Sequence, residues 1–139
     1  MKKGNIQPYL FFGGRCGKAL EFYRQALGAQ VVFQMLFKDS PEPASPGMLP
    51  PGWENKIMHT SFTIGETVLM ASDGCGAPQP FEGFSLHLSM PKEADAKQAF
   101  AALAENGEVQ MPLRKTFWSP CFGKVTDRFG IGWMISVEA

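Results

Sequence analysis

The sequence has few of the features that would assign it to a specialised class of protein. Its 139 residues include only two histidines and three cysteines, and its thirteen basic and thirteen acidic residues cancel. Without a basic surplus, we expect no attraction to nucleic acid or to an anionic membrane. No apolar run approaches the roughly 20 residues that span a bilayer. No apolar signal segment follows Met1. We therefore expect a cytoplasmic protein with neither a nucleic-acid nor a membrane partner.

The three cysteines, Cys16, Cys75 and Cys121, are widely spaced and form no Cys-x-x-Cys pair. Their odd number and spacing indicate reduced thiols, and argue against a disulfide framework and a structural zinc site. A reactive thiolate needs a nearby cation or a helix N-terminus. Because Lys124 is the only cation close to Cys121 in sequence, we expect that thiol to be inert.

The hydrophobic periodicity predicts a strand, a helix and three strands, in that order and twice over. The first set comprises strands at 6–12, 30–37, 56–64 and 67–72 and a helix from Cys16 that Gly28 ends; the second comprises strands at 84–90, 108–113, 122–126 and 133–137 and a helix that starts at Pro91 and ends at 106–107. An internal duplication of this length outweighs single strand assignments. It predicts one domain built from two modules, at about 5–73 and 82–138.

Two connections have distinctive compositions. Residues 39–53 contain five prolines, which exclude a helix or a central strand and predict an exposed loop, either a functional lid or an unstructured connection. The last two strands are joined at 127–130, where Asp127 is expected to cap its own backbone and Gly130 to adopt a positive φ. Alternate residues of 133–137 are apolar, so one face of that strand should be core and the other wetter.

Two stretches resemble one known superfamily. They are Ala-Leu-Glu-Phe-Tyr-Arg-Gln-Ala-Leu-Gly-Ala at 19–29 and Thr-Phe-Trp-Ser-Pro-Cys-Phe-Gly-Lys-Val-Thr-Asp-Arg-Phe-Gly-Ile-Gly-Trp-Met-Ile at 116–135. They are similar to the vicinal oxygen chelate superfamily, which includes glyoxalase I, bleomycin-resistance proteins and extradiol dioxygenases. Within it the chain looks most like the PhnB-like branch, sometimes labelled demethylubiquinone-methyltransferase-like. The similarity extends from Gln7 to Val137. It implies an α+β fold in which two tandem βαβββ modules form an open cup-shaped sheet, and it implies a homodimer.

The resemblance also implies where a metal would bind. Metal-dependent members take one ligand each from the first and last strands of both modules, and these positions fall here at or near Pro8, Met70, Ser85 and Met134. None is His, Asp or Glu, whereas hard divalent cations need oxygen or imidazole donors. We therefore expect a small-molecule-binding protein that needs no metal or other cofactor, with its activity unassigned.

Two other functions compete with this interpretation. A divalent-metal-dependent lyase, isomerase or dioxygenase acting on a small oxygen-rich metabolite would need shifted ligands, such as the two histidines with Glu82. Drug sequestration, as in the bleomycin-resistance proteins, would need a strongly acidic surface for a cationic ligand. The balanced charge speaks against sequestration.

The candidate ligand-binding residues lie on the polar sides of two predicted strands. Strand parity places His59 with Ser61, and His87 with Ser85. If these faces line the cup, the imidazoles could orient a polar ligand or act as general acids and bases. Alternatively, the histidines are bonded within the sheet or face solvent.

Aromatic side chains could supply the apolar side of such a site. Trp53 and Trp118 lie beside loop residues, so we expect them at the rim of a pocket for a planar ligand. Phe117 and Phe122 are near Trp118 in sequence, and for them core or dimer packing is an equally good explanation.

One motif is rejected. Residues 13–18 read Gly-Gly-Arg-Cys-Gly-Lys and join a strand to a helix, as phosphate-binding loops do. Phe12 and Ala19 stand where a Walker loop needs Gly and Ser or Thr, and the glycines do not follow the dinucleotide-binding order. Nothing predicts the doubly wound parallel sheet expected of a methyltransferase.

Overall fold

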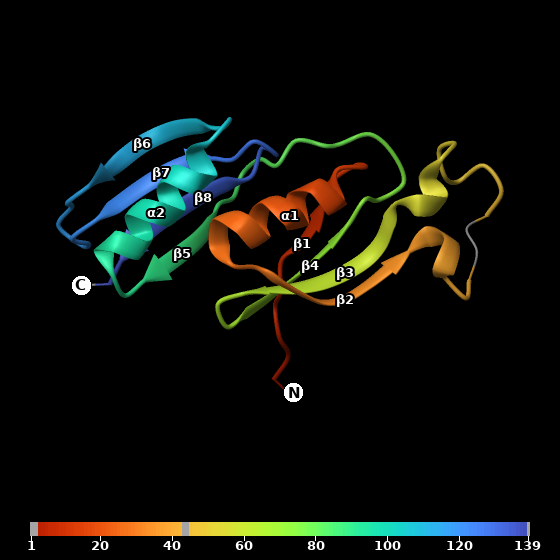
Figure 1. Ribbon diagram of the computed structural model, residues 1–139, viewed down its shortest axis with the longest axis horizontal. Coiled ribbons are helices and arrows are strands. Elements are labelled where there is room, and N and C mark those ends of the chain that lie inside the picture. Colours follow the sequence, from red (N-terminus) through yellow and green to blue (C-terminus); the bar gives the residue numbers. More distant parts are fainter. Residues whose placement is uncertain (1–2, 43–44, 139) are drawn as a thin grey trace. The chain divides into compact units, whose positions relative to one another are not determined.

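The computed structural model describes residues 3–42 and 45–138, which form two compact units that divide between Gln79 and Pro80. Each unit contains one four-stranded sheet and one α-helix (Figure 1). The predicted α+β class is confirmed, and so is the repeated order of a strand, a helix and three strands.

The first unit is built from β1, α1, β2, β3 and β4. Their bounds are β1 Tyr9–Phe11, α1 Cys16–Leu27, β2 Gln30–Leu36, β3 Ile57–Ile64 and β4 Thr67–Ser72, with short 3-10 helices η1 Phe37–Asp39 and η2 Trp53–Asn55. The strand order is β1-β4-β3-β2; β1 runs parallel to β4, and the other pairs are antiparallel.

The second unit repeats this topology. Its bounds are β5 Leu86–Met90, α2 Glu93–Ala104, β6 Glu108–Arg114, β7 Phe122–Thr126 and β8 Gly132–Val137. The strand order is β5-β8-β7-β6, with β5 parallel to β8. In both units, therefore, the first and last strands of the module are neighbours.

The core of each unit lies between its helix and one face of its sheet. In the first unit Leu20 and Tyr23 of α1 are buried together with Phe62 and Leu69. The helix ends at Gly28, whose φ of 71° lets its N–H reach the carbonyl of Arg24. In the second unit the buried residues of α2 are Ala96, Ala99, Phe100 and Leu103, whose spacing places them on one side of the helix.

The hairpin between β7 and β8 follows the prediction from Asp127 and Gly130. Oδ1 of Asp127 accepts hydrogen bonds from the backbone N–H groups of Phe129 (2.8 Å) and Ile131 (3.1 Å). Oδ2 accepts one from Nε1 of Trp133 at 2.8 Å, and Gly130 has a φ of 92°. The buried carboxylate thus fixes both the turn and an indole of the core.

Two strands start two or more residues later than the periodicity predicts. β1 starts at Tyr9 rather than Ile6, because Pro8 has no N–H for the ladder, although its carbonyl accepts a hydrogen bond from the N–H of Met70 (3.0 Å). β5 starts at Leu86 rather than Phe84, because Leu86 already pairs with Trp133, next to the first residue of β8. Consequently Phe84 and Ser85 precede the strand.

Other regions agree with the expectation of exposed connections. The proline-rich stretch 39–53 is largely exposed where it is described; residues 43–44 lie outside the described chain.

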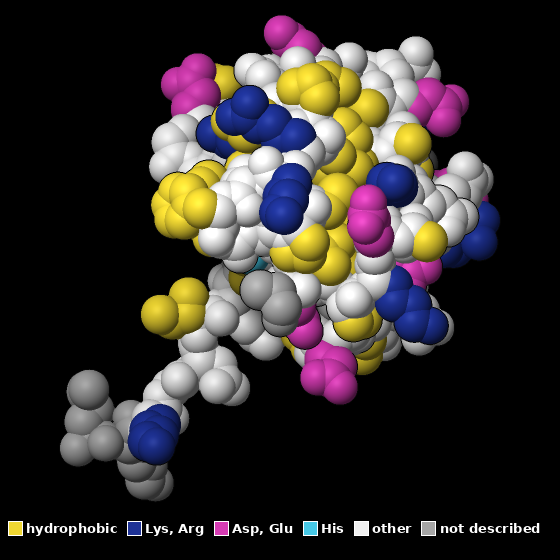
Figure 2. Space-filling model, turned by 90° about the vertical axis from the view of Figure 1, so that its left-hand side faces the viewer, with side chains coloured by type: hydrophobic (Ala, Val, Ile, Leu, Met, Phe, Trp, Pro, Cys, Tyr) yellow, Lys and Arg dark blue, Asp and Glu magenta, His cyan; other side chains and the backbone are white. Residues whose placement is uncertain are grey.

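On the side of the second unit that Figure 2 faces, separate acidic and basic side chains surround a band of hydrophobic ones. Neither α1 nor α2 nor any other helix of the described residues has the length and apolarity to cross a membrane.

Candidate functional site

The face of the first sheet opposite its buried core carries His59 and Ser61. Strand pairing places Tyr9 and Ser61 each opposite Met70, and Phe33 opposite Ser61, so all of them share this face. The Tyr9 and Phe33 side chains are 38% and 47% exposed. This open face therefore presents aromatic surface together with polar groups.

His59 is bonded to Tyr9 on this face. Nδ1 of His59 lies 2.8 Å from the phenolic oxygen of Tyr9, and the two ring centroids are 5.5 Å apart. Phe33 packs on the other side, 6.1 Å from the imidazole. Burial is the main cause that raises the pKa of Tyr9, with the Cys16 thiol adding to it and Ser72 partly offsetting it. The phenol is thus protonated at neutral pH and can donate to Nδ1 of a neutral imidazole.

This hydrogen bond leaves donors and acceptors available for a ligand. Across residues 3–42 and 45–138, neither Nε2 of His59 nor the hydroxyl of Ser61 makes a hydrogen bond. Both side chains are half-buried. When the phenol donates to Nδ1, the neutral imidazole holds its proton on Nε2, so that atom can donate to a ligand acceptor.

The corresponding face of the second sheet carries His87. Its Nε2 lies 2.7 Å from Oγ of Ser136, a side chain that is 7% exposed. His87 pairs with Met134, which in turn pairs with Lys124 of β7, so these three share one face. Ser85 is exposed just before β5 and makes no hydrogen bond in the part of the chain that the structure describes.

Trp53 has a structural contact. Its Nε1 donates to the carbonyl of Gly74 at 2.7 Å, and Nζ of Lys56 lies 6.0 Å from its ring and bonds the carbonyl of Gly14 at 3.0 Å. Within the described residues no ring contact or hydrogen bond joins Trp53 to His59. A pocket-rim role for Trp53 therefore stays a prediction.

Trp118 lies in the loop between β6 and β7 and is 51% exposed. Its ring meets those of Phe117, 97% exposed, and Phe122, 5% exposed, at centroid distances of 4.6 and 5.3 Å. Phe122 is therefore a core residue. Trp118 and Phe117 extend from it as an aromatic tip, available to a ligand or to another chain.

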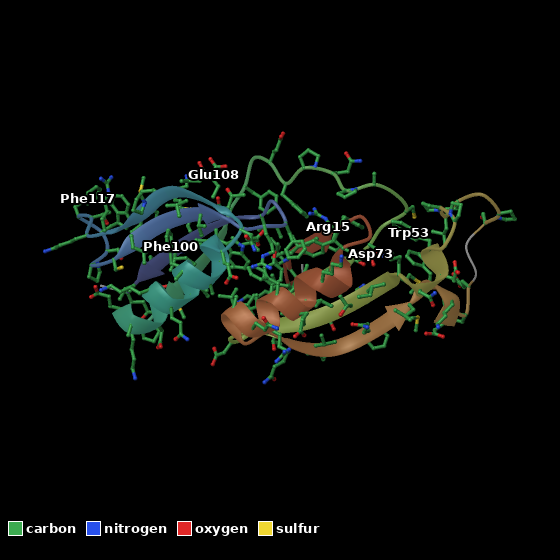
Figure 3. All side chains as sticks on the ribbon, turned by 45° about the horizontal axis from the view of Figure 1, so that its top comes forward. Arg15, Trp53, Asp73, Phe100, Glu108 and Phe117 are labelled. Carbon is green, nitrogen blue, oxygen red and sulfur yellow. The ribbon has the colours of Figure 1, made fainter. Side chains whose placement is uncertain are left out.

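Asp73, which the sequence interpretation missed, organises the start of α1. Its carboxylate is 2% exposed; Oδ1 accepts from the N–H groups of Gly14 and Cys16, and Oδ2 from that of Ile57, all at 2.8 Å. Figure 3 shows Arg15, Asp73 and Trp53 together at this end of the helix. The loop that resembles a phosphate-binding loop thus binds a carboxylate of its own chain. The paired glycines before the helix were the feature of the sequence that could have indicated this carboxylate-binding loop.

The two buried thiols are protonated. Burial and then the Asp73 carboxylate raise the pKa of Cys16 far above its usual value. Burial, and to a smaller extent Glu93, raises the pKa of Cys121, against a weaker opposing effect of Lys97. Both shifts disfavour the thiolate that a nucleophile or a metal ligand requires.

The positions that bind metal in related enzymes do not provide a set of hard donors here. The strand register brings Tyr9, rather than Pro8, opposite Met70, and His87 opposite Met134. Two thioethers beside a phenol and an imidazole do not suit a hard divalent cation. The described residues contain no group of three or more His, Cys, Asp or Glu side chains placed to hold an ion. The residues present therefore do not fit the superfamily's metal.

Comparison with known families identifies the class of protein. The model of the Glyoxalase/Bleomycin resistance protein/Dioxygenase superfamily matches residues 5–135. The chain therefore belongs to this superfamily, as the sequence predicts. Proteins of this superfamily usually bind small molecules and form dimers.

Individual relatives share nearly the whole chain. Protein YjdN from Escherichia coli (strain K12) is 36% identical over 138 residues, which are 95% of this chain and 94% of that protein. The crystal structure of protein PA1353 from Pseudomonas aeruginosa is 43% identical, with 98% of each chain covered and a TM-score of 0.83. A putative 3-demethylubiquinone-9 3-methyltransferase, PhnB protein, from Bacillus cereus is 24% identical, covers 96% of this chain and 99% of its own, and has a TM-score of 0.76. This likeness shows that the two chains share the fold.

Proposed function

We propose that the protein binds a small organic molecule on its histidine-bearing sheet faces without a metal or another cofactor. His59 and His87 orient the ligand, and Ser61 and Ser85 add hydrogen bonds. The observation that carries the proposal is the Tyr9–His59 pair, which holds a polar, oriented imidazole within exposed aromatic surface. No catalytic residue is assigned, and turnover is not part of the proposal.

The composition of the first face suits a planar ligand with polar substituents. Phe11, which is 52% exposed, stacks 5.0 Å from Tyr9, and Phe33 lies on the far side of His59. Small-molecule sites combine apolar and aromatic walls with a few placed polar groups. Here Nε2 of His59 and the hydroxyl of Ser61 are those groups.

The remaining predicted residues complete the proposal. Trp118 offers an exposed ring in the second unit, and Trp53 remains at the rim in the first. His87 is less free than His59, since Ser136 engages its Nε2, so it contacts the ligand through Nδ1. We assign His87 a weaker contribution to affinity than His59.

We further propose a homodimer that works in the cytoplasm. β2 forms an edge of the first sheet, and its Val31 and Val32 side chains are 51% and 66% exposed. Exposed apolar edge strands are usually paired or covered. Sedimentation velocity should therefore give twice the chain mass of 15.3 kDa. A monomer at micromolar concentration would refute the dimer without affecting ligand binding.

The test of ligand binding is a thermal-shift screen of metabolites in the presence of EDTA, followed by mapping of each hit on amide NMR spectra. A ligand that binds only the native state raises the melting temperature. We expect a hit that perturbs β3 and binds His59→Ala at least about tenfold more weakly than wild type. The exposed Glu66, at the turn after β3, supplies the matched control Glu66→Gln, which should bind normally.

Two results would overturn the proposal. Stoichiometric divalent metal in the purified protein, or hits that need added metal, would support the metal-dependent lyase, isomerase or dioxygenase instead. Hits that bind wild type and His59→Ala equally would show that the ligand does not bind at the face to which we assign it.

A further inference from the structure

A small pocket lies at one end of the second sheet. Its volume is about 290 Å³, and its lining residues are Phe81, Phe84, Ser85, Gln110, Lys124, Val125, Thr126, Gly130, Gly132 and Trp133. Gly132 allows the segment before β5 to approach the hairpin, since a Cβ there would lie 3.3 Å from Oγ of Ser85. The pocket is therefore bounded by a strand, a turn and a neighbouring segment of one unit.

Lys124 is the charged residue of this pocket. It is also the only Lys, Arg, Asp or Glu in β5, β7 and β8. Its side chain is half-buried, and it makes no ion pair or hydrogen bond within the described chain. Removing an ammonium from water is costly unless an anion or a hydrogen-bond acceptor compensates. A half-buried lysine with no partner inside the chain is available to bind an anion from outside it.

The surroundings favour a negative partner. No Asp or Glu lines the pocket, while Ser85, Thr126 and Gln110 bring groups able to donate hydrogen bonds. Gln110 donates to Thr126 only at 3.4 Å. Glu108 pairs with Thr126 at the sheet edge but is exposed and forms no ion pair with Lys124.

We propose that this pocket binds the carboxylate or phosphate of a small organic molecule, with Lys124 as the counter-ion and Ser85 and Thr126 as hydrogen-bond donors. The volume of about 290 Å³ lies at the lower limit of small-molecule pockets, so the pocket suits a small anionic ligand. The edge-to-face pair of Phe81 and Phe84, 6.5 Å apart, supplies an apolar wall for the adjoining part. The inference rests on the proposed function, because Lys124 shares a sheet face with His87 and would define the chemistry of the ligand that this face binds.

The experiment uses benzoate and phenyl phosphate as anionic probes, with benzamide as the uncharged isostere of benzoate. Each is titrated into the full chain at constant ionic strength while amide signals are recorded. We expect the two anions to shift signals of β7 and of residues 81–85, and benzamide to bind at least about tenfold more weakly than benzoate.

Variants test the role of the ammonium. Lys124→Gln should weaken the binding of both anions by about tenfold or more. Lys124→Arg, which keeps the charge, should retain most of the affinity. The exposed Lys115 supplies the control Lys115→Gln, which should leave binding unchanged. Native amide spectra of each variant confirm that it folds.

Several outcomes would overturn the inference. They are no shift with either anion, shifts outside this pocket, equal binding of benzamide, or equal binding by Lys124→Gln. The proposed function fails in a different way. A metabolite hit that is lost in His59→Ala but unaffected by Lys124→Gln would support the proposed function and refute the anion pocket. Benzoate binding that needs Lys124, without any metabolite hit that depends on His59, would support the anion pocket and refute the proposed function.

Discussion

Tyr9 and His59 are hydrogen-bonded to each other although their two strands are separated by a third strand. Tyr9 belongs to β1 and His59 to β3, and β4 separates the two strands in the sheet. The 2.8 Å contact therefore crosses β4 diagonally, because Met70 of β4 lies opposite Tyr9 on one side and opposite Ser61 on the other. The candidate imidazole is thus oriented by the side chain of a residue on the same face and not by the backbone.

Tyr9→Phe tests this orientation. Without the phenolic O–H, Nδ1 of His59 loses its partner, so the imidazole should change from mainly the Nε2–H tautomer to a mixture. The ¹⁵N chemical shifts of the histidine rings report this directly. Because the contact is partly exposed, the free energy of unfolding should fall by no more than about 1 kcal/mol. The His87 signals serve as the internal control. A wild-type His59 that is mainly Nδ1–H would contradict the assignment.

Asp73→Asn should destabilise the first unit strongly. The change removes the charge and replaces one accepting oxygen with an NH₂ group that faces backbone donors. We expect the free energy of unfolding to fall by about 2–4 kcal/mol, since buried hydrogen bonds to charged groups are stronger than those between neutral groups. Urea unfolding measures it. The exposed Asp39 provides the control Asp39→Asn, which should change stability by no more than about 0.5 kcal/mol. A similar effect of the two substitutions would refute the role given to Asp73.

Gly123→Ala should destabilise the second unit. A Cβ at this position of β7 would lie 2.8 Å from the Phe100 ring and 2.9 Å from the carbonyl oxygen of Met111. Overpacking of this kind costs about 1–3 kcal/mol. Gly76→Ala is the control, because no atom lies within 4 Å of the added Cβ. Combining Gly123→Ala with Phe100→Leu should recover part of the loss, and strict additivity would show that the ring is not the obstacle.

Alkaline pH should weaken the fold through Cys16. Burial and the Asp73 carboxylate raise the pKa of this thiol in the folded state far above its ordinary value of about 9, so the folded state keeps a proton that the unfolded state releases. The contribution of Cys16 is complete below pH 9 and decreases as the pH rises above it, by at most about 1.4 kcal/mol per unit. Urea titrations at several pH values should show a smaller slope for Cys16→Ala. The exposed Cys75 gives the control Cys75→Ala, which should keep the wild-type slope.

Local periodicity was sufficient for much of the fold. The bounds of β4 and β7 depend on neighbouring residues, and they agree with the structure. Strand ends were harder, because they depend on the partner strand. β5 begins where β8 becomes available, which the sequence of β5 does not reveal.

The candidate site was predictable only in part. Strand parity correctly placed His59 and His87 on the faces opposite the core, but the partner of each depends on sheet register. Tyr9 is 50 residues from His59 in sequence, and Ser136 is 49 from His87. In the sequence Lys124 is only a neighbour of Cys121, because its place in a pocket depends on the approach of residues 81–85 to the hairpin.

The three tryptophans are divided between the two units, and this distribution provides an optical probe. Trp53 lies in the first unit, while the buried Trp133 and the exposed Trp118 lie in the second. In a Trp53→Phe protein all indole fluorescence would come from one half of the duplicated chain. Comparing its denaturation curve with far-ultraviolet circular dichroism would show whether the two halves melt together or one after the other.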